Sequence, residues 1–465
     1  MDYVDFLKSK EEKVVNKGFK VSREELNSKL FEYQKDIVLW ALSKGKAALF
    51  EDCGLGKGPQ MLEWSNIINK KTGEDVLIVT PLGVAIQMVS EAKKVLDLNI
   101  TLARSQEDVK AGVNVTNYEN LDKFDESKFI AVALDESSIL KNYTGKTRMK
   151  LKSKFKNIKY KLVATATPAP NDYIELLNQA DFLEVMDTAK SLSMFFINDM
   201  KTGDWRLKGH SVKAFWEWVS EWAVYIKSPS DLGYSDKEYK LPELEEIKHI
   251  LKIDTIDRSF KDGFLRKIET SATSFHKEKN LTADLRCKEC AKIACSTNEQ
   301  YLIWVDTNNE ADLLKKYIPE AVEVRGSDKS SFKEEASIKF KEGKIRVLIS
   351  KPKIFGYGMN FQMCHNAVFC GLTYSYEDYY QATRRLYRFG QKNKVNNYIV
   401  IGNTENRILE VIREKQDKQK IMELNINNSI RNIQLRKVKG TEKEEKKIEE
   451  IIEIPVWLKG DNNAI

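Results

Sequence analysis

Residues 46–60 have the sequence KAALFEDCGLGKGPQ, and this stretch decides the interpretation of the whole chain. An apolar run is followed by a loop with glycines, a lysine and a helical pattern. This order predicts a phosphate-binding loop, because backbone N–H groups can surround an anion there and Lys57 can reach the β- and γ-phosphates. A tight surface turn is the alternative for such a loop taken alone. The candidate phosphate contacts are Gly54, Gly56, Lys57 and Gly58.

The bulk properties describe a charged globular protein. A chain of 465 residues can hold two or three domains, and 42% hydrophobic with 31% charged residues is typical of a soluble one. No apolar run approaches the roughly 18 residues of a membrane span, and the first residues do not resemble a secretion signal. Six scattered cysteines suit a reducing compartment, so we expect a cytoplasmic protein. The net charge of +7 permits a nucleic-acid partner without requiring one.

Strands alternate with helical segments in two separate parts of the chain, which predicts parallel sheets with crossover helices. Aromatic residues crowd the segment between these parts, with eight of them over 195–225; we expect core packing there, with contact to nucleic acid as the alternative. The expected divisions are a helical N-terminal segment (1–29), a first α/β lobe (30–185), an aromatic-rich helical insertion (186–239), a second α/β lobe (240–425) with a helical excursion (256–297), and a charged tail (426–465).

A second motif is the apolar run 130–134 followed by Asp135 and Glu136. In a nucleotide hydrolase, Asp135 would hold Mg²⁺, and Glu136 would orient and deprotonate the attacking water. A strand followed by an acidic turn is the alternative for this motif alone. Because the phosphate loop precedes it in the same α/β half, we favour nucleotide hydrolysis.

A third motif, QATRRLYRFGQ over residues 381–391, falls in a segment that we expect to be helical over 376–389. On a helix, Arg385 and Arg388 would share a face because they are three residues apart. Two guanidinium groups presented together suit the charge that develops on a γ-phosphate. A patch that binds a phosphate backbone, or simple solvated charge, is the alternative.

Taken in order, these motifs resemble the Swi/Snf-like ATPases of helicase superfamily two, particularly the compact forms of phages and mobile elements, over roughly residues 30–425. The resemblance implies an α/β fold of two tandem RecA-like lobes, each a parallel sheet flanked by helices, with helical insertions. It also implies the roles of further residues. Nucleotide contacts are implied for Gln34, Gly358 and Gln381, contacts to a DNA strand for Thr80, Pro81, Thr116, Asn117 and Tyr118, and coupling of hydrolysis to lobe movement for Thr165 and Thr167.

Four positions depart from the family pattern. Phe31 and Glu32 replace the usual basic and proline residues before Gln34, and Ser138 stands where the family has a relay histidine. Gly58 stands where a Ser or Thr hydroxyl normally binds Mg²⁺. Since water can replace this ligand but not its placement, we expect a slow ATPase that needs a high Mg²⁺ concentration.

The resemblance therefore predicts a DNA-dependent ATPase, a helicase-like translocase that uses ATP and Mg²⁺ and acts on duplex DNA with little sequence preference. Lys57 lies in the first half and the arginines in the second, so hydrolysis would require closure of the lobes. Two alternatives stay open: a nucleotide-gated DNA-binding clamp with little or no turnover, and an RNA-directed helicase.

Cys287, Cys290 and Cys295 are spaced in a way that invites a metal interpretation. Only three cysteines are present, the neighbouring residues favour helix, and no second C-x-x-C pair occurs. We therefore expect these cysteines to pack in a helix.

Overall fold

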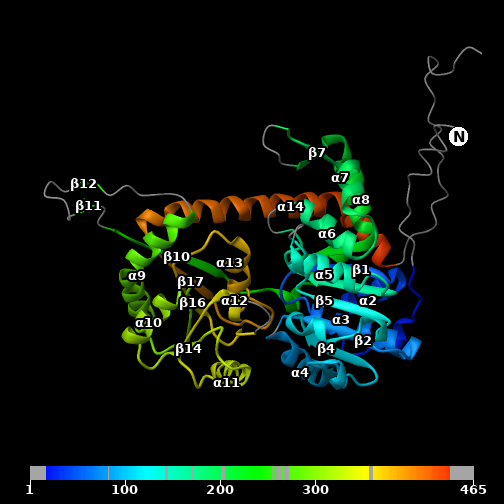
Figure 1. Ribbon diagram of the computed structural model, residues 1–465, viewed down its shortest axis with the longest axis horizontal. Coiled ribbons are helices and arrows are strands. Elements are labelled where there is room, and N and C mark those ends of the chain that lie inside the picture. The colour runs from blue at the N-terminus through cyan, green and yellow to red at the C-terminus, as the bar shows by residue number, and fades with distance from the viewer. Residues whose placement is uncertain are drawn as a thin grey trace, which may run out of the picture.

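The computed structural model describes residues 17–81, 83–141, 145–169, 172–200, 205–253, 256–257, 264–265, 272–355 and 360–439. The described chain forms two α/β lobes that lie side by side (Figure 1). Of the helical segment expected over 1–29, the described part contains one short 3₁₀ helix, Arg23–Glu25. Gly358 lies outside the described residues, as does most of the charged tail.

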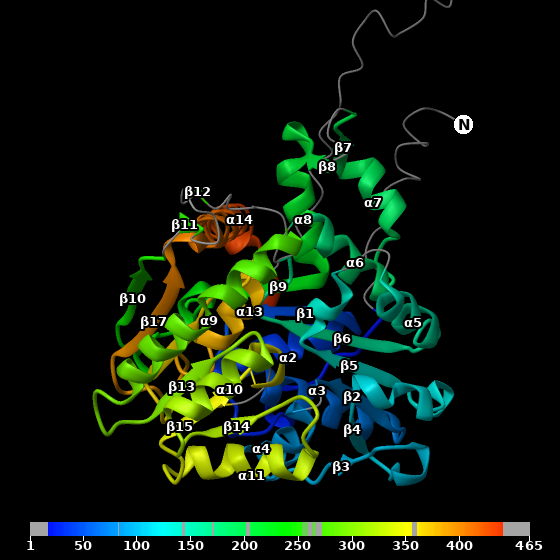
Figure 2. The ribbon, with the colours of Figure 1, turned by 60° about the vertical axis from the view of Figure 1, so that its left-hand side comes forward.

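Lobe 1 is built on a seven-stranded parallel sheet with the order β3-β4-β2-β5-β6-β1-β9. Helices cover both faces of this sheet (Figure 2), which explains why its strands are continuous apolar runs. The strands are β1 (Lys46–Glu51), β2 (Val76–Thr80), β3 (Thr101–Leu102), β4 (Val113–Asn117), β5 (Ala131–Asp135), β6 (Tyr160–Thr165) and β9 (Ala223–Ile226). The helices are α2 (Glu32–Lys44), α3 (Lys57–Thr72), α4 (Val84–Leu96), α5 (Lys146–Lys154), α6 (Ile174–Phe182), α7 (Thr188–Phe195) and α8 (Val212–Trp222).

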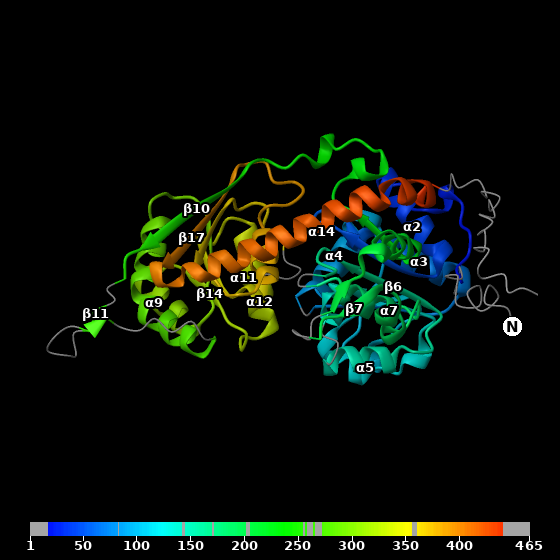
Figure 3. The same ribbon diagram turned by 90° about the horizontal axis from the view of Figure 1, so that it is seen from above.

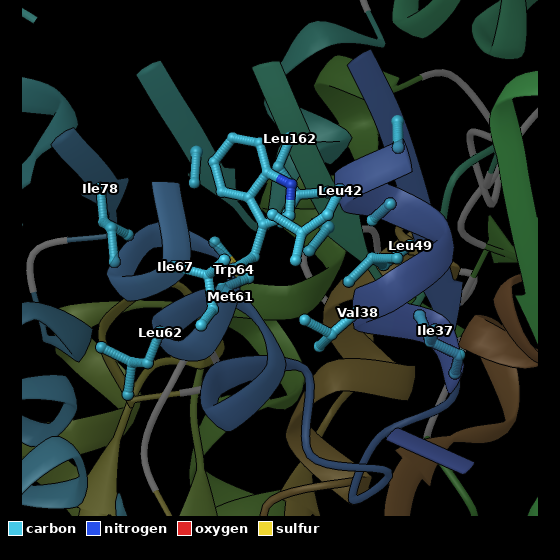
Figure 4. Packing of buried hydrophobic residues seen from close by; sticks show 14 of the residues in the cluster. Ile37, Val38, Leu42, Leu49, Met61, Leu62, Trp64, Ile67, Ile78 and Leu162 are labelled. Carbon is cyan, nitrogen blue, oxygen red and sulfur yellow. The ribbon is translucent and has the colours of Figure 1, made fainter. Parts of the chain in front are cut away.

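Successive residues of β1 enter two different cores, as the alternation of side chains along a strand requires. Ala47 and Leu49 face the core that α2, α3 and α4 cover, while Ala48 and Phe50 face the other. Figure 4 shows Trp64 of α3 packed in the first core, where it is fully buried. This packing fixes α3, whose first residue is Lys57, against the end of β1.

The aromatic-rich segment belongs to lobe 1. Phe215, Trp216 and Trp222 are buried, and the ring of Trp222 meets Phe50 edge-on at 5.9 Å between centroids, so the expectation of core packing is confirmed. Beyond its helices, the segment contains a short antiparallel pair, β7 (Phe196–Asn198) and β8 (Trp205–Leu207), and ends in β9, which pairs with β1 at the edge of the main sheet. The helical insertion predicted over 186–239 therefore supplies a strand to the first lobe.

Lobe 2 contains a six-stranded parallel sheet with the order β10-β17-β16-β13-β15-β14. The strands are β10 (Leu244–Leu251), β13 (Tyr301–Trp304), β14 (Val322–Val324), β15 (Val347–Ser350), β16 (Asn366–Cys370) and β17 (Val395–Gly402), and the two-residue strands β11 (Ile256–Asp257) and β12 (Phe264–Leu265) pair separately. The helices are α9 (Ala272–Ala294), α10 (Asn308–Tyr317), α11 (Ser330–Lys341), α12 (Pro352–Phe355), α13 (Tyr376–Thr383) and α14 (Asn406–Val438).

Two of the three cysteines expected to pack in a helix do so, whereas Cys295 follows the last residue of α9 and is exposed. Cys287 and Cys290 are buried in the core between α9 and the sheet, and both carry free thiols. Among the described residues no group of histidines, cysteines and carboxylates is arranged to hold a metal ion.

Helix α14 connects the lobes physically. It starts after β17 and runs across the molecule to lobe 1, as Figure 3 shows from above. At its far end, Lys437 forms an ion pair with Glu221 of α8. Over the part of the chain that can be described, no helix has the length and apolar character needed to cross a membrane.

Candidate functional site between the lobes

The phosphate loop leaves β1 and enters α3 through two glycines in the left-handed region, Gly54 (φ +93°) and Gly56 (φ +82°). Glycine adopts this conformation without strain, and close neighbours also exclude a side chain. A Cβ on Gly56 would lie 2.2 Å from Nε2 of Gln34, and one on Gly54 would lie 2.9 Å from the backbone N of Phe389 in lobe 2. The loop, which belongs to lobe 1, therefore also lies in close contact with lobe 2.

Lys57 is held at the mouth of this loop. Its Nζ donates hydrogen bonds to the backbone oxygens of Glu51 (2.7 Å) and Asp52 (3.2 Å). Below it, burial raises the pKa of Glu51 to about 7, although Lys57 and the hydrogen bond from Gln60 act in the opposite direction. Sequence analysis missed Glu51 and Asp52, and the available signal was the pair of carboxylates that precedes the loop.

Gln34, the expected nucleotide-contacting glutamine, lies directly against the loop and is buried. Its Nε2 donates to the backbone oxygen of Leu55 (2.9 Å), and its Oε1 accepts from the backbone N–H of Phe31 (3.0 Å). The hydroxyl of Tyr33 donates to the same oxygen of Leu55 at 2.5 Å. A change in the conformation of the loop would therefore alter the hydrogen bond that Gln34 donates to Leu55.

Asp135 is the last residue of β5 and Glu136 follows it; β5 lies two strands from β1 in the sheet. Burial raises the pKa of Asp135 to about 7; the neighbouring Glu136 adds to the increase, and Lys57 opposes it. Burial also raises the pKa of Glu136, against the positive charges of Lys57 and Arg385. Both carboxylates therefore lie near the loop lysine, as the sequence predicted.

Two features of Glu136 mark it as more than a turn residue. Its backbone is left-handed (φ +50°), a conformation that is uncommon for a side-chain-bearing residue and that often occurs at functional sites. Its Oε2 is buried and has no hydrogen-bond partner among the described atoms. A buried carboxylate oxygen in this state suits a water or Mg²⁺-bound ligand, because such oxygens are normally satisfied.

The arginine motif does not have the predicted local structure. Helix α13 ends at Thr383, and residues 384–390 form turns, so the helix expected over 376–389 is too long. The carbonyls that would continue the helix have other donors: the N–H of Phe361 donates to Arg385 O, and Nε2 of Gln391 donates to Leu386 O. The helical argument for a face shared by Arg385 and Arg388 was therefore wrong.

The two arginines nevertheless come together. Burial lowers the pKa of Arg388, and the positive charge of Arg385 lowers it further. Gln381 positions Arg385, since its Oε1 accepts from Nη2 (2.8 Å) and its backbone oxygen accepts from Nε (3.1 Å). Both arginines also oppose the raised pKa of Glu136 in lobe 1. One region thus contains Lys57 and Glu136 from lobe 1 together with Arg385 and Arg388 from lobe 2.

Direct contacts close this region. Nη2 of Arg384 lies 2.5 Å from Oδ2 of Asp52, and the hydroxyl of Tyr380 donates to the same carboxylate. Although burial lowers the pKa of Arg384, Asp52 keeps it above the ordinary value. Lys141 and Glu377 form a second ion pair between the lobes. These interlobe contacts were not predicted.

The two threonines expected to couple the lobes are Thr165, the last residue of β6, and Thr167 just beyond the strand, and both are fully buried. Oγ1 of Thr165 accepts from the backbone N–H of Thr167 at 3.1 Å. Oγ1 of Thr167 has no partner among the described atoms. Thr167 thus keeps a hydroxyl available in the interior next to the acidic strand β5, which pairs with β6.

A cavity of about 530 Å³ opens beside the phosphate loop and has walls from both lobes. Tyr239 and Phe389 face each other in its wall with ring centroids 4.7 Å apart, and the hydroxyls of Tyr33 and Tyr239 share a hydrogen bond of 2.8 Å. Leu55 and Arg384 also line it. Sequence analysis did not identify Tyr239, which lies in the connection between the lobes.

A larger groove of about 660 Å³ separates the lobes on the side of β2 and β4. Of the five residues expected to contact DNA, Pro81 and Asn117 line this groove. Thr80 and Thr116 are buried beneath it, and Oγ1 of Thr80 donates to Pro81 O at 3.1 Å. The hydroxyl of Tyr118 donates instead to the backbone oxygen of Asp135 (2.7 Å), which joins this edge to the acidic pair.

The groove carries a basic excess. Arg104 lines it from lobe 1, and Lys333 and Lys353 line it from lobe 2, against the carboxylates of Glu119 and Glu334. Cations on both walls are what a phosphate backbone laid across the two lobes would require.

Comparisons with known proteins agree with this arrangement. The family described as "Helicase conserved C-terminal domain" matches residues 285–390. A curated relative from Drosophila melanogaster, "SWI/SNF-related matrix-associated actin-dependent regulator of chromatin subfamily A-like protein 1", is 22% identical over 431 residues, which are 84% of this chain and 56% of the relative. The chain thus spans about half the length of that protein.

Among solved structures, the "Sulfolobus solfataricus SWI2/SNF2 ATPase core in complex with dsDNA" is similar over 90% of this chain and 99% of that chain, with 17% identity and a TM-score of 0.42. By its matched helicase domain and its curated relative, this chain is similar to helicases and to SWI/SNF-related proteins.

Proposed function

We propose that this chain is an ATP-dependent motor that acts on duplex DNA and hydrolyses ATP between its two lobes. The observation that supports this most strongly is the meeting of the phosphate loop with the arginine motif, where Gly54 packs against Phe389 and Asp52 pairs with Arg384. Neither lobe contains all the charges that a triphosphate needs, so the closed arrangement is the competent one.

In this proposal Lys57 leaves its backbone acceptors to bind the β- and γ-phosphates. Asp135 would hold Mg²⁺, which neutralises charge on the phosphate oxygens when it is bound. The fit rests on the carboxylate oxygens of Asp135 and Glu136, one of which has no partner among the described atoms. Arg385 and Arg388 would stabilise charge that develops on the γ-phosphate, an effect worth roughly 10³–10⁵ in rate for an arginine supplied this way.

The raised pKa values suit this division of work. A carboxylate that accepts a proton from water works best with a pKa near the ambient pH, and burial moves the pKa of Glu136 upward. Asp135, with a pKa of about 7, must be ionised to bind a cation. Lys57 favours the ionised form of both, so the same lysine would support binding and catalysis.

The adenosine half of ATP would enter the cavity of about 530 Å³ beside the loop. Tyr239 and Phe389 offer aromatic surfaces there, and Gln34 lies on the far side of Leu55. Because Tyr239 belongs to the connection between the lobes and Phe389 to lobe 2, a bound base would also favour closure.

Duplex DNA would lie across the groove, with its phosphates on Arg104, Lys333 and Lys353. DNA that touches both walls stabilises the closed state, and opening after hydrolysis releases one wall first. Repetition of this cycle would move the lobes along the duplex.

The test is the rate of ATP turnover by the full chain without nucleic acid and with duplex DNA, single-stranded DNA or RNA, at several Mg²⁺ concentrations. We expect the largest stimulation with duplex DNA and loss of turnover in Lys57→Ala. Binding of DNA without turnover under every condition would replace the motor by a nucleotide-gated clamp. A larger stimulation by RNA would instead favour an RNA-directed helicase.

A further inference from the structure

Gly58 lacks the hydroxyl that normally follows the loop lysine, and the structure has a carboxylate beside the empty position. A Cβ built on Gly58 would lie 3.4 Å from Oε2 of Glu91, and among the described residues no other atom outside its own helix lies within 4 Å. A hydroxyl on that Cβ would extend one bond further. Glu91 therefore borders the volume in which the missing oxygen ligand would lie.

The carboxylate of Glu91 is positioned by its own helix. Glu91 lies in α4, which packs beside α3, and Nε2 of Gln87 donates to its Oε1 at 2.6 Å. This bond occupies one oxygen of the carboxylate, and the other, Oε2, is the one nearest Gly58. The side chain is half-buried, so it is held rather than free in solvent.

The charges around Glu91 belong to the nucleotide site. Burial raises the pKa of Asp135, and Glu91 is among the neighbours that raise it further, which places the two carboxylates near each other. From lobe 2, Lys341 and Arg388 approach the same carboxylate: burial lowers the pKa of each, and the charge of Glu91 opposes that decrease. Glu91 thus lies where the loop, the acidic pair and the second lobe meet.

We propose that Oε2 of Glu91 supplies, directly or through a water molecule, the Mg²⁺ ligand that the hydroxyl after the loop lysine supplies in other phosphate loops. The inference rests on the proposed function, since it concerns the Mg²⁺ that accompanies ATP. Mg²⁺ is commonly bound by one or two carboxylates together with phosphate oxygens, so Asp135 and Glu91 form a suitable pair. In this arrangement the absence of a side chain at Gly58 leaves space for the carboxylate of Glu91. On this view the protein binds Mg²⁺ well despite Gly58.

A competing role is a contact between the lobes, in which Glu91 only neutralises Lys341 and Arg388. The two roles differ in what they do to metal affinity when Gly58 is changed. Gly58 lies in a helical conformation without a positive φ, and its nearest neighbour leaves ordinary van der Waals space, so Gly58→Thr can introduce the hydroxyl without backbone strain. A restored hydroxyl should make Glu91 less important only if both serve the same ion.

The experiment measures the affinity of Mn²⁺ for the full chain with ADP by electron paramagnetic resonance, without any turnover. We expect Glu91→Gln, which keeps the size of the side chain, to weaken Mn²⁺ binding by about 10–100-fold. In the Gly58→Thr background the same change should cost roughly threefold or less, a coupling that a double-mutant cycle detects. Glu74→Gln, an exposed residue of the same lobe, is the matched control and should change nothing.

Unchanged Mn²⁺ affinity in Glu91→Gln would overturn the proposal, and so would an equal loss in both backgrounds, which would favour the lobe contact. Circular dichroism and a thermal melt establish that each variant is folded. Failure of the proposed function has a different signature. In that case ADP would not bind to the wild type, or Lys57→Ala would bind Mn²⁺ and ADP as the wild type does.

Discussion

Loss of the ion pair between Asp52 and Arg384 should open the lobes. The pair joins the phosphate loop to the arginine motif at 2.5 Å, and the hydroxyl of Tyr380 bonds the same carboxylate. The side chains of Arg384 and Asp52 are only 16% and 20% exposed, so solvent screens them weakly. Each contact exists only when the lobes are closed, and its energy therefore contributes wholly to closure.

The size of the effect follows from these contacts. A hydrogen bond to a charged group contributes about 1.5–3 kcal/mol when it is protected from solvent. Taking about 2 kcal/mol for Arg384→Ala, the ratio of closed to open molecules should fall by about 30-fold. Tyr380→Phe removes a single hydroxyl bonded to the same carboxylate and, at about 1.5 kcal/mol, should lower the ratio by about 10-fold.

Single-molecule energy transfer between the lobes can measure this ratio. One dye can be attached to Cys295, the exposed thiol of lobe 2, and the other to an azide-bearing residue introduced at Glu74 in lobe 1. Lys93→Ala is a suitable control, because it removes an exposed ion pair with Asp97 that lies within lobe 1. We expect Arg384→Ala and Asp52→Asn to raise the low-transfer population and the control to leave it unchanged.

Two results would refute this reasoning. The closed population could be the same in Arg384→Ala and in the wild type, in which case the pair does not hold the lobes. Alternatively, the effects of Asp52→Asn and Arg384→Ala could add fully in the double variant, in which case the two residues do not act through each other.

Three further results should follow. Burial, with Glu136, raises the pKa of Asp135 to about 7, so the protonated carboxyl stabilises the fold at low pH and this contribution is lost as pH rises from about 4 to 7. Calorimetry in metal-free buffer should therefore find Asp135→Asn increasingly more stable than the wild type over that range. A constant difference in stability between the two proteins would contradict the assignment. Trp222→Ala should lower the free energy of unfolding of lobe 1 by about 3–5 kcal/mol in a urea titration, because the ring is fully buried, and a loss below about 1 kcal/mol would contradict its core position. Each replacement of Arg104, Lys333 or Lys353 with alanine should reduce the slope of log affinity for duplex DNA against log salt concentration by about one unit. An unchanged slope would mean that the DNA binds elsewhere.

The strands and most helices could be predicted from local pattern. Strand β2 is an apolar run and helix α4 is amphipathic, and these patterns match their burial, because both faces of the strand and one face of the helix are buried. Strand β9 was not predicted separately, since Ala223–Ile226 follows directly on the aromatic helix α8. Its identity is set by pairing with β1, a tertiary contact that no local pattern contains.

The site residues could be predicted where a single short segment carries the whole motif. The loop around Lys57 and the acidic pair at Asp135 each carry a recognisable spacing, and the structure brings both to the same region. The end of α13 was not predictable, because the carbonyls of Arg385 and Leu386, just beyond it, accept from Phe361 and Gln391 and do not continue the helix. Contacts between distant segments share this limitation.

Asp52 and Glu91 illustrate it most clearly. Asp52 meets an arginine 332 positions further along the chain, so its partner is visible only in the folded protein. Glu91 lies within an ordinary amphipathic helix, where a lone acidic residue gives no signal of a site. Its relation to Gly58 becomes apparent only when α3 and α4 are packed side by side.

The most direct test of the central claim is the rate of ATP hydrolysis by Arg388→Ala with saturating duplex DNA. If one triphosphate lies between Lys57 and the arginines of the second lobe, this variant should bind a fluorescent ATP analogue nearly as well as the wild type and hydrolyse ATP about 10³-fold or more slowly. Arg407→Ala, an exposed arginine of α14, should keep the wild-type rate. Turnover by Arg388→Ala within threefold of the wild type, at equal occupancy by ATP, would contradict the account.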